Sequence, residues 1–134
     1  MRIEIVDIGH VHQVWPMVAG FIDSALEFSK GDYSPQDAKV LVSTGQWSLL
    51  VAVDDQGVQG AATVSFFNRP NDRVAFITAI GGKLISSPET VAQLKQILSQ
   101  YGATCIEGAA RDSIARLWSR YGFSEKYKIV GVSI

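Results

Sequence analysis

The residues from Gly81 to Glu89 could hold a phosphate group. A pair of glycines lets two backbone amides approach an anion closely, and lysine and serine side chains can donate hydrogen bonds to its oxygens. Ser87 stands before Pro88 in the pattern of a helix N-terminus, where free amides and the helix dipole favour negative charge. The candidate anion-binding residues are Gly81, Gly82, Lys83, Ser86 and Ser87.

Each of these residues also has a structural explanation. A glycine pair provides the bend or bulge with which a strand leaves a sheet, Ser87 caps a helix, and an isolated lysine is usually solvated. Pro88 removes one backbone donor at the helix start, and Glu89 places a negative charge beside it. The sequence alone leaves both interpretations open.

Glu107 is a candidate general base because it lies within a short β-rich segment, 104–109. A carboxylate inside a sheet is costly unless it is paired or protonated. Either its pKa is raised, so that it can take a proton from an amine, or Arg111 or Arg116 pairs with it, or it lies at an exposed strand end. We favour the ion pair or the exposed end.

The remaining chemistry-bearing residues give weaker signals. Tyr121 could present a phenol as a catalytic proton donor, but its position three residues after Trp118 also suits packing of a helix face. Cys105 is expected to be a small buried apolar residue and not a catalytic thiolate. His10 and His12 lack the i, i+4 spacing of metal ligands on a helix, so no metal site is expected.

The composition is that of one soluble globular domain spanning residues 1–134. Hydrophobic residues make up 47% of the chain, and the net charge is −1 with no run of either sign. We therefore expect no nucleic acid and no membrane among its partners. The single cysteine and a start that lacks a signal-peptide pattern favour a cytoplasmic location.

Two hydrophobic periodicities divide the chain into short strands and amphipathic helices. Alternation predicts strands at 3–8, 47–53, 58–67, 73–80, 104–109 and 126–134. Spacings of three and four predict helices at 11–25, 35–44, 88–101 and 112–121, the first of which should begin late or bend at Pro16. Three antiparallel strands in succession, followed by a strand–helix–strand unit, predict an α/β or α+β class with a mixed sheet.

This order of elements resembles that of the GCN5-related N-acetyltransferase (GNAT) superfamily over essentially the whole chain. A sharper match is the segment Arg111-Asp-Ser-Ile-Ala-Arg-Leu-Trp-Ser-Arg-Tyr-Gly-Phe123. It resembles the superfamily's last helix, which reads Asn, two residues, Ala-Ile, a spacer, Leu-Tyr, three residues and Gly-Phe. Arg111 stands in place of the asparagine, and Trp118 stands in place of the tyrosine that often protonates the departing thiolate.

The resemblance implies a twisted mixed β-sheet with splayed central strands, flanked by about four helices. It also implies acetyl-CoA or another acyl-CoA as the cofactor, with its pyrophosphate at the N-terminus of the helix that begins near Pro88. The acyl group would lie between the strand ending at Gly81 and the strand containing Glu107. The acceptor amine would dock near three acids that also suit the solvated face of the first helix: Asp23, Glu27 and Asp32.

In one loop and two dipeptides, the chain most resembles the small GNAT-like proteins encoded by tailed bacteriophages and prophages. Gly81-Gly82 comes earlier than the glycines of the superfamily's usual loop. The two dipeptides are the tryptophan-proline pair in the first helix and Tyr121-Gly122. Two functions stay open: an acyl-CoA-dependent N-acyltransferase acting on an unknown amine, or a non-catalytic binding or virion-assembly module. The alternating segment 126–134 could pair with another copy in a homodimer. A virion location would follow if the protein is phage-encoded.

Overall fold

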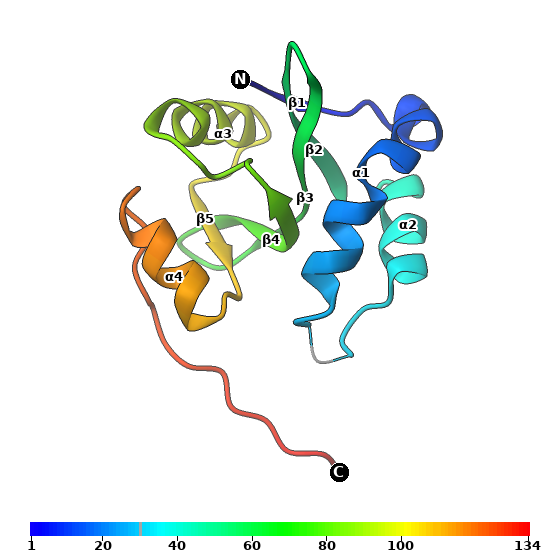
Figure 1. The fold of residues 1–134 in the computed structure, drawn as a ribbon. Coiled ribbons are helices and arrows are strands. Elements are labelled where there is room, and N and C mark those ends of the chain that lie inside the picture. The colour runs from blue at the N-terminus through cyan, green and yellow to red at the C-terminus, as the bar shows by residue number, and fades with distance from the viewer. Residues whose placement is uncertain (30) are drawn as a thin grey trace.

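The computed structural model describes residues 1–29 and 31–134, and its strands form one sheet in the order β1-β2-β3-β4-β5 (Figure 1). The strands are β1 (Arg2–Ile5), β2 (Ser48–Asp54), β3 (Gly57–Asn68), β4 (Arg73–Gly82) and β5 (Cys105–Gly108). The helices are α1 (Val11–Leu26), α2 (Pro35–Ser43), α3 (Pro88–Gln100) and α4 (Asp112–Ser119), with a 3-10 turn at Ile8–His10. None of the helices in these ranges is long and apolar enough to cross a membrane.

Helices cover both faces of the sheet: α1 and α2 lie on one face, and α3 and α4 lie on the other (Figure 1). The strands supply alternate side chains to two cores, because successive side chains of a strand point to opposite faces. On β2, Leu49 and Val51 pack with α1 and α2, whereas Leu50 and Ala52 pack with α3. The predicted fold class, a mixed sheet flanked by four helices, is confirmed.

The pairing of β4 with β5 covers only part of β4. The two strands run parallel and pair from Val74 to Ile77 of β4 and from Cys105 to Gly108 of β5. Strand β4 runs on to Gly82 and stays paired there with β3. Within the described part of the chain, the β5-facing edge of β4 from Thr78 onward therefore has no strand beside it. We call the opening beyond the Ile77–Gly108 pair the fork.

A β-bulge at Thr78 marks the start of the fork. Thr63 of β3 pairs with Ala79 and Val64 pairs with Ile77, so Thr78 is an extra residue on β4. The Thr78 hydroxyl lies 2.7 Å from the Thr63 Oγ1 atom and 3.0 Å from the Thr63 carbonyl oxygen. The extra residue reverses the alternation, because Ile77 packs in the α3 core and Ala79 in the α1 core. A bulge bends and twists its strand, and this bulge lies where the pairing of β4 with β5 ends.

Helix α1 begins at Val11 and runs through Pro16 to Leu26, so the expected late start is wrong. Pro16 lies on the exposed side of the helix. It removes one backbone hydrogen bond there, while the buried side, with Trp15, Val18 and other apolar residues, packs against the sheet. Tertiary packing therefore outweighs the local cost of the proline.

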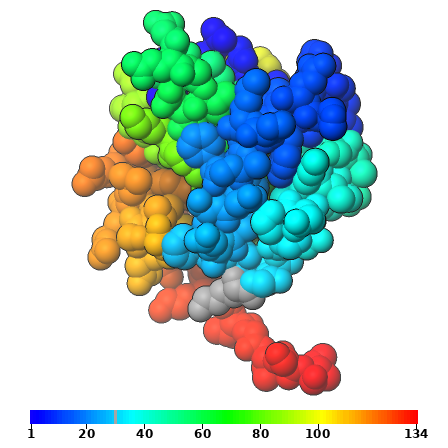
Figure 2. Space-filling model, turned by 45° about the vertical axis from the view of Figure 1, so that its right-hand side comes forward, coloured from blue at the N-terminus to red at the C-terminus, as the bar shows by residue number. Residues whose placement is uncertain are grey.

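The predicted strand at 126–134 does not form, and this expectation is wrong. These residues belong to no strand and run out from the body of the molecule (Figures 1 and 2). Their alternation is that of a strand, but a strand must pair with a neighbouring edge, and the segment pairs with none in the described part of its own chain.

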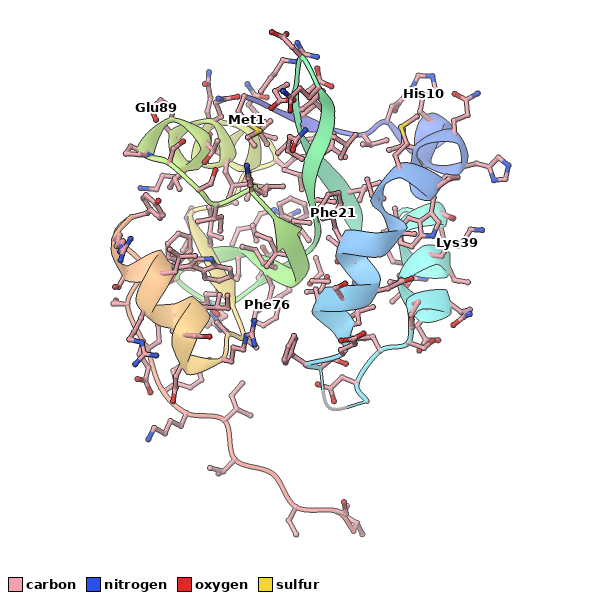
Figure 3. All side chains as sticks on the ribbon, in the orientation of Figure 1. Met1, His10, Phe21, Lys39, Phe76 and Glu89 are labelled. Atoms are coloured by element: carbon pink, nitrogen blue, oxygen red, sulfur yellow. The ribbon has the colours of Figure 1, made fainter. Side chains whose placement is uncertain are left out.

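The glycine pair at the end of β4 is packed tightly against two other elements. A Cβ on Gly81 would lie 2.5 Å from the carbonyl oxygen of Phe21 on α1, and Figure 3 labels Phe21 in this region. A Cβ on Gly82 would lie 2.3 Å from the carbonyl oxygen of Gln59, and Gly82 has a φ of +71°. Close backbone approach thus requires glycine at both positions.

We expect Gly81→Ala to lower the free energy of unfolding by about 1–3 kcal/mol, because the new methyl group overlaps α1 backbone that cannot swing aside. Chemical denaturation followed by circular dichroism measures the change. Gly20→Ala is the matched control: Gly20 lies in α1 with nothing within 4 Å of the added Cβ, so this variant should gain about 0.4–1 kcal/mol. Equal stabilities for the two variants would contradict the packing explanation.

Candidate functional site

The fork is built from strand edges and the start of a helix. On one side β4 presents the free backbone edge that begins at Thr78, and on the other side β5 ends at Gly108 and the chain turns into α4. The Trp118 ring lies over this end of β5, since a Cβ on Gly108 would be 3.3 Å from its Cζ3 atom. Backbone amides and carbonyls along a free edge can bind an extended ligand as a neighbouring strand would.

The start of α3 lies just beyond the end of β4. Ser87 caps the helix, because its hydroxyl accepts a hydrogen bond from the Thr90 amide at 3.1 Å. In return, the Thr90 hydroxyl oxygen accepts hydrogen bonds from the Ser86 and Ser87 amides at 3.3 and 3.2 Å. The Ser86 hydroxyl donates to the Lys83 carbonyl oxygen at 2.6 Å. The predicted cap is present, and it occupies two of the candidate amide donors.

These residues offer amide, hydroxyl and ammonium donors to an anion such as the pyrophosphate of an acyl-CoA. A charged oxygen accepts stronger hydrogen bonds than a hydroxyl does, so an anion can compete with the Thr90 hydroxyl for the Ser86 and Ser87 amides. The Lys83 side chain is exposed three residues before Ser86. Glu89 is also exposed in the first turn of α3 (Figure 3), where its charge opposes that of a phosphate.

Glu107 is held as a carboxylate by two cations. Arg69 donates two hydrogen bonds to it, one of which joins Nη2 to Oε1 at 2.9 Å, and the Lys126 Nζ atom lies 2.7 Å from Oε2. Hydrogen bonding to Arg69 and then to Lys126 lowers the pKa of Glu107 to about 2, although burial acts in the opposite direction. Glu107 is therefore ion-paired, as expected, but not with Arg111 or Arg116, and a raised pKa is not found.

The partners of Glu107 are not the ones the sequence suggested. Arg111 lies with its guanidinium 4.0 Å from the ring centroid of Phe28, and Arg116 lies in the last turn of α4. Arg69 follows β3 and Lys126 follows α4, so both are far from Glu107 along the chain. Only the pairing of the strands and the course of the chain after α4 bring these three charges together.

Tyr121 and Glu107 line the same groove. The groove has a volume of about 530 Å³ and is bounded by β5, by the end of α3 and by the chain that follows α4. None of its lining residues belongs to the candidate anion loop at 81–87. The two predicted catalytic residues therefore lie together on the outer side of β5, apart from the predicted cofactor-binding residues at the end of β4.

The other candidate residues take no part in this arrangement, apart from Cys105, which also lines the groove. Burial raises the pKa of the Cys105 thiol, so it is a poor nucleophile. Glu27 and Asp32 are exposed, while the Oδ1 atom of Asp23 is buried without a hydrogen-bond partner among the described residues. In the same ranges of the chain, no three His, Cys, Asp or Glu side chains gather in a group that could hold a metal.

Three residues of the site were missed from the sequence: Arg69, Thr78 and Lys126. Arg69 lies in a turn cluster, and its sequence neighbours carry no sign of a distant carboxylate. Thr78 stands inside a continuous β-forming run, where a bulge leaves no mark on the alternation of small and apolar residues. Their roles depend on which strands become neighbours.

No protein-family model matches the sequence, and no curated protein matches it. Solved structures do match the fold. A probable acetyltransferase has a TM-score of 0.71 at 14% identity, with 100% of this chain and 98% of that chain covered. An aminoglycoside acetyltransferase from an uncultured soil metagenomic sample, in complex with sisomicin, has a TM-score of 0.70 at 11% identity, with 99% and 94% covered.

A third similar structure is a ribosomal-protein-alanine N-acetyltransferase from Brucella melitensis biovar Abortus 2308. Its TM-score is 0.69 at 12% identity, and both chains are covered completely. At these identities the likeness shows the fold alone. A shared fold does not decide function. The protein has the fold of the GNAT acetyltransferases, as the sequence resemblance predicted.

We expect the Glu107 ion pairs to stabilise the protein above pH 4.5 and to lose this effect as the pH falls toward 2. The folded-state pKa of about 2 is below the ordinary value of 4.5, so the unfolded chain takes up the proton first as acid is added. Glu107→Gln should therefore be less stable than the parent at pH 6, and the difference should shrink by pH 3. Urea unfolding at pH 6, 4.5 and 3 measures it.

Glu4→Gln is the control for this experiment, because Glu4 also pairs with an arginine, at 2.6 Å, but on the surface. Exposed ion pairs contribute little, so this variant should follow the parent curve at every pH. A Glu107→Gln variant that also follows the parent would show that Arg69 and Lys126 leave the Glu107 pKa unshifted.

Proposed function

We propose that the protein is an acyl-CoA-dependent N-acyltransferase that transfers an acetyl group from acetyl-CoA to an amine. One observation carries the proposal: beyond the Ile77–Gly108 pair, β4 continues without β5 beside it, and it ends shortly before the N-terminus of α3. A free strand edge suits an extended amide-containing chain, and the helix start beyond it suits a pyrophosphate. The structural similarity to solved acetyltransferases supports this proposal.

In this proposal Lys83, Ser86 and Ser87 hold the pyrophosphate through an ammonium group, a hydroxyl and backbone amides. Gly81 and Gly82 do not need to touch it, because their part is to let β4 pass close to α1 and β3 before the chain turns toward α3. The acyl group then lies in the fork, beside the bulge at Thr78. A bulge leaves its extra residue out of the strand ladder.

When bound, acetyl-CoA supplies a thioester carbonyl that an amine can attack. The amine nitrogen forms a bond to the carbonyl carbon, the carbon–sulfur bond breaks, and the amine loses a proton as the thiolate gains one. The chain contributes orientation within the fork and backbone hydrogen bonds from β4 to the carbonyl oxygen, where charge develops. These contributions require no strong acid.

Glu107 and Tyr121, which the sequence suggested as catalytic residues, take no part in proton transfer in this proposal. A carboxylate with a pKa of about 2 is a weak base near neutral pH, so Glu107 is poorly suited to take a proton from an amine. Its ion pairs fix the outer edge of β5 instead. Tyr121 lies beside Glu107 in the groove and packs against the α3 core.

A second candidate is the non-catalytic binding or assembly module, as in GNAT-like proteins of phages. One observation favours it: the loop that would hold the pyrophosphate already satisfies the Ser86 and Ser87 amides with the Thr90 hydroxyl. Pro88 supplies no amide, and the Glu89 charge opposes a phosphate. Direct measurement of cofactor binding separates the two candidates.

We expect acetyl-CoA and CoA to bind in the micromolar range and Ser87→Glu to weaken both by about tenfold or more, because the new carboxylate repels the pyrophosphate. Calorimetric titration measures the affinities. Ser34→Glu is the matched control, since Ser34 caps α2 through the same Ser-Pro capping box. Both variants lose about 1 kcal/mol of capping, but Ser34→Glu should bind like the parent.

Absence of heat and of any thermal shift at millimolar CoA would overturn the acyltransferase proposal and leave the binding module. Equal weakening by Ser34→Glu and Ser87→Glu would place the pyrophosphate elsewhere, because the two variants share only the lost cap.

We expect Glu89→Gln to tighten CoA binding by about two- to fivefold, because it removes a negative charge from the first turn of α3. The gain should shrink as salt is added. Asp112→Asn is the matched control, since Asp112 is an exposed acid in the first turn of α4. Titration of each variant at low and high salt measures the effect, and an equal gain for both variants would argue against binding at α3.

A further inference from the structure

A contact between a cation and an aromatic ring joins the two faces of the molecule beside the fork. The Arg111 guanidinium lies 4.0 Å from the ring centroid of Phe28. Arg111 immediately precedes α4, which lies on one face of the sheet, and Phe28 follows α1, which lies on the other face (Figure 1). The contact can pass from one face to the other because β5 has already ended, at Gly108, three residues before Arg111.

One flank of α1 runs along the fork and is apolar. Phe21 touches the end of β4, since a Cβ on Gly82 would lie 2.9 Å from a carbon of its ring. Ala25 follows one turn later, and the Phe28 amide donates a hydrogen bond to the Ala25 carbonyl oxygen, which keeps Phe28 on the same flank. Phe76 of β4 lies between α4 and α1 in the view of Figure 3. Aromatic rings therefore border this side of the fork.

Arg111 brings a positive charge to this apolar surface. Asp23 and Glu27 are each two residues from Ala25, so their side chains point to other sides of the helix. Arg111 belongs to none of the ion pairs among residues 1–29 and 31–134. Asp112 is the acid next to it in the chain, and it lies exposed in the first turn of α4, where the helix dipole favours its charge.

The stacked guanidinium keeps its hydrogen-bond donors available. The Phe28 ring covers one face of the planar group, whereas the five N–H groups of an arginine point outward within its plane. Two of these groups match the two oxygens of a carboxylate. The ring also restricts a flexible side chain, so less freedom is lost when an anion binds. Arg111 on Phe28 therefore suits a carboxylate that arrives together with an apolar group.

We propose that the acyl acceptor is an amine that also carries a carboxylate, as an amino acid with an apolar side chain does. This inference rests on the proposed acyltransferase function. In that function the cofactor binds at the start of α3, and α3 lies above α4 in Figure 1. Arg111, at the start of α4, is therefore left to the acceptor: it holds the carboxylate, while Phe21 and Phe28 contact the apolar side chain.

The carboxylate takes no part in the bonds that change. The amine nitrogen bonds to the acyl carbon as the carbon–sulfur bond breaks, and the proton that the amine loses goes to the leaving CoA thiolate. The Arg111 charge also repels acceptors that carry several positive charges, such as polyamines.

L-phenylalanine and L-phenylalaninamide test the inference, because the amide lacks the negative charge and is otherwise nearly the same molecule. Each is incubated with the 134-residue protein and acetyl-CoA, and mass spectrometry measures the N-acetyl product. L-leucine and L-leucinamide form a second pair, and spermidine is the polyamine. In each pair kcat/KM should be at least about tenfold higher for the amino acid than for the amide, and spermidine should be the poorest acceptor.

Variants of Arg111 separate recognition of the carboxylate from a structural role. Arg111→Gln should raise the KM for L-phenylalanine about tenfold or more and leave that for L-phenylalaninamide unchanged, whereas Arg111→Lys should restore part of the preference because it keeps the charge. Phe28→Leu should also weaken the preference, since the guanidinium loses its ring. Arg120→Gln is the matched control: Arg120 is an exposed arginine at the other end of α4, and its variant should behave like the parent.

Calorimetric titration of the parent and of Arg111→Gln with acetyl-CoA distinguishes the ways to fail. Absence of acetyl-CoA binding to the parent would overturn the proposed function, and this inference with it. Acetyl-CoA binding without acetylation of either amino acid, or with equal kcat/KM for amino acid and amide, would overturn this inference alone. A loss of acetyl-CoA affinity in Arg111→Gln would show that Arg111 contacts the cofactor and not the acceptor.

Discussion

The end of the β4–β5 ladder at the Ile77–Gly108 pair is the constraint on which the rest of the structure depends. The bulge at Thr78 bends β4 at this point, and the Thr63–Thr78 hydrogen bonds fix the bend within the sheet. Beyond it, β4 keeps its pairing with β3 and carries the chain to the start of α3, while β5 turns into α4. The end of the β4–β5 pairing in the middle of the sheet thus coincides with one extra residue on β4.

Strand β5 separates two surfaces of different chemistry. Its β4 side opens into the fork, where we have proposed that backbone groups and the start of α3 bind an extended, negatively charged ligand. Its outer side carries the groove, where Glu107 is neutralised by Arg69 and Lys126. These ion pairs join β3, β5 and the chain after α4, so they fix the point from which residues 128–134 leave the molecule. The ion pairs of Glu107 therefore stabilise the structure and do not suit this residue to proton transfer.

The glycine pair at 81–82 shows how one motif supports two explanations that only packing can separate. A phosphate cradle needs open space above the backbone, whereas the space above Gly81 and Gly82 is filled by Phe21 and by the Gln59–Gly60 backbone. In the proposed function, the anion therefore binds at the next turn, at Ser86 and Ser87. Solved acetyltransferases share this fold at 11–14% identity. A common fold is thus compatible with very different sequences.

The sequence by itself determined the elements and their order, because periodicity, capping and turn residues act over a few neighbours. The boundaries of α2 and α3 follow from Ser-Pro caps, and the mixed sheet follows from the order of strands and helices. Only the tertiary structure decided the bulge at Thr78, the Arg69–Glu107–Lys126 cluster and the fate of 126–134. Each of these depends on which distant backbone becomes a neighbour: the same alternation is a strand beside a free edge and an exposed tail without one.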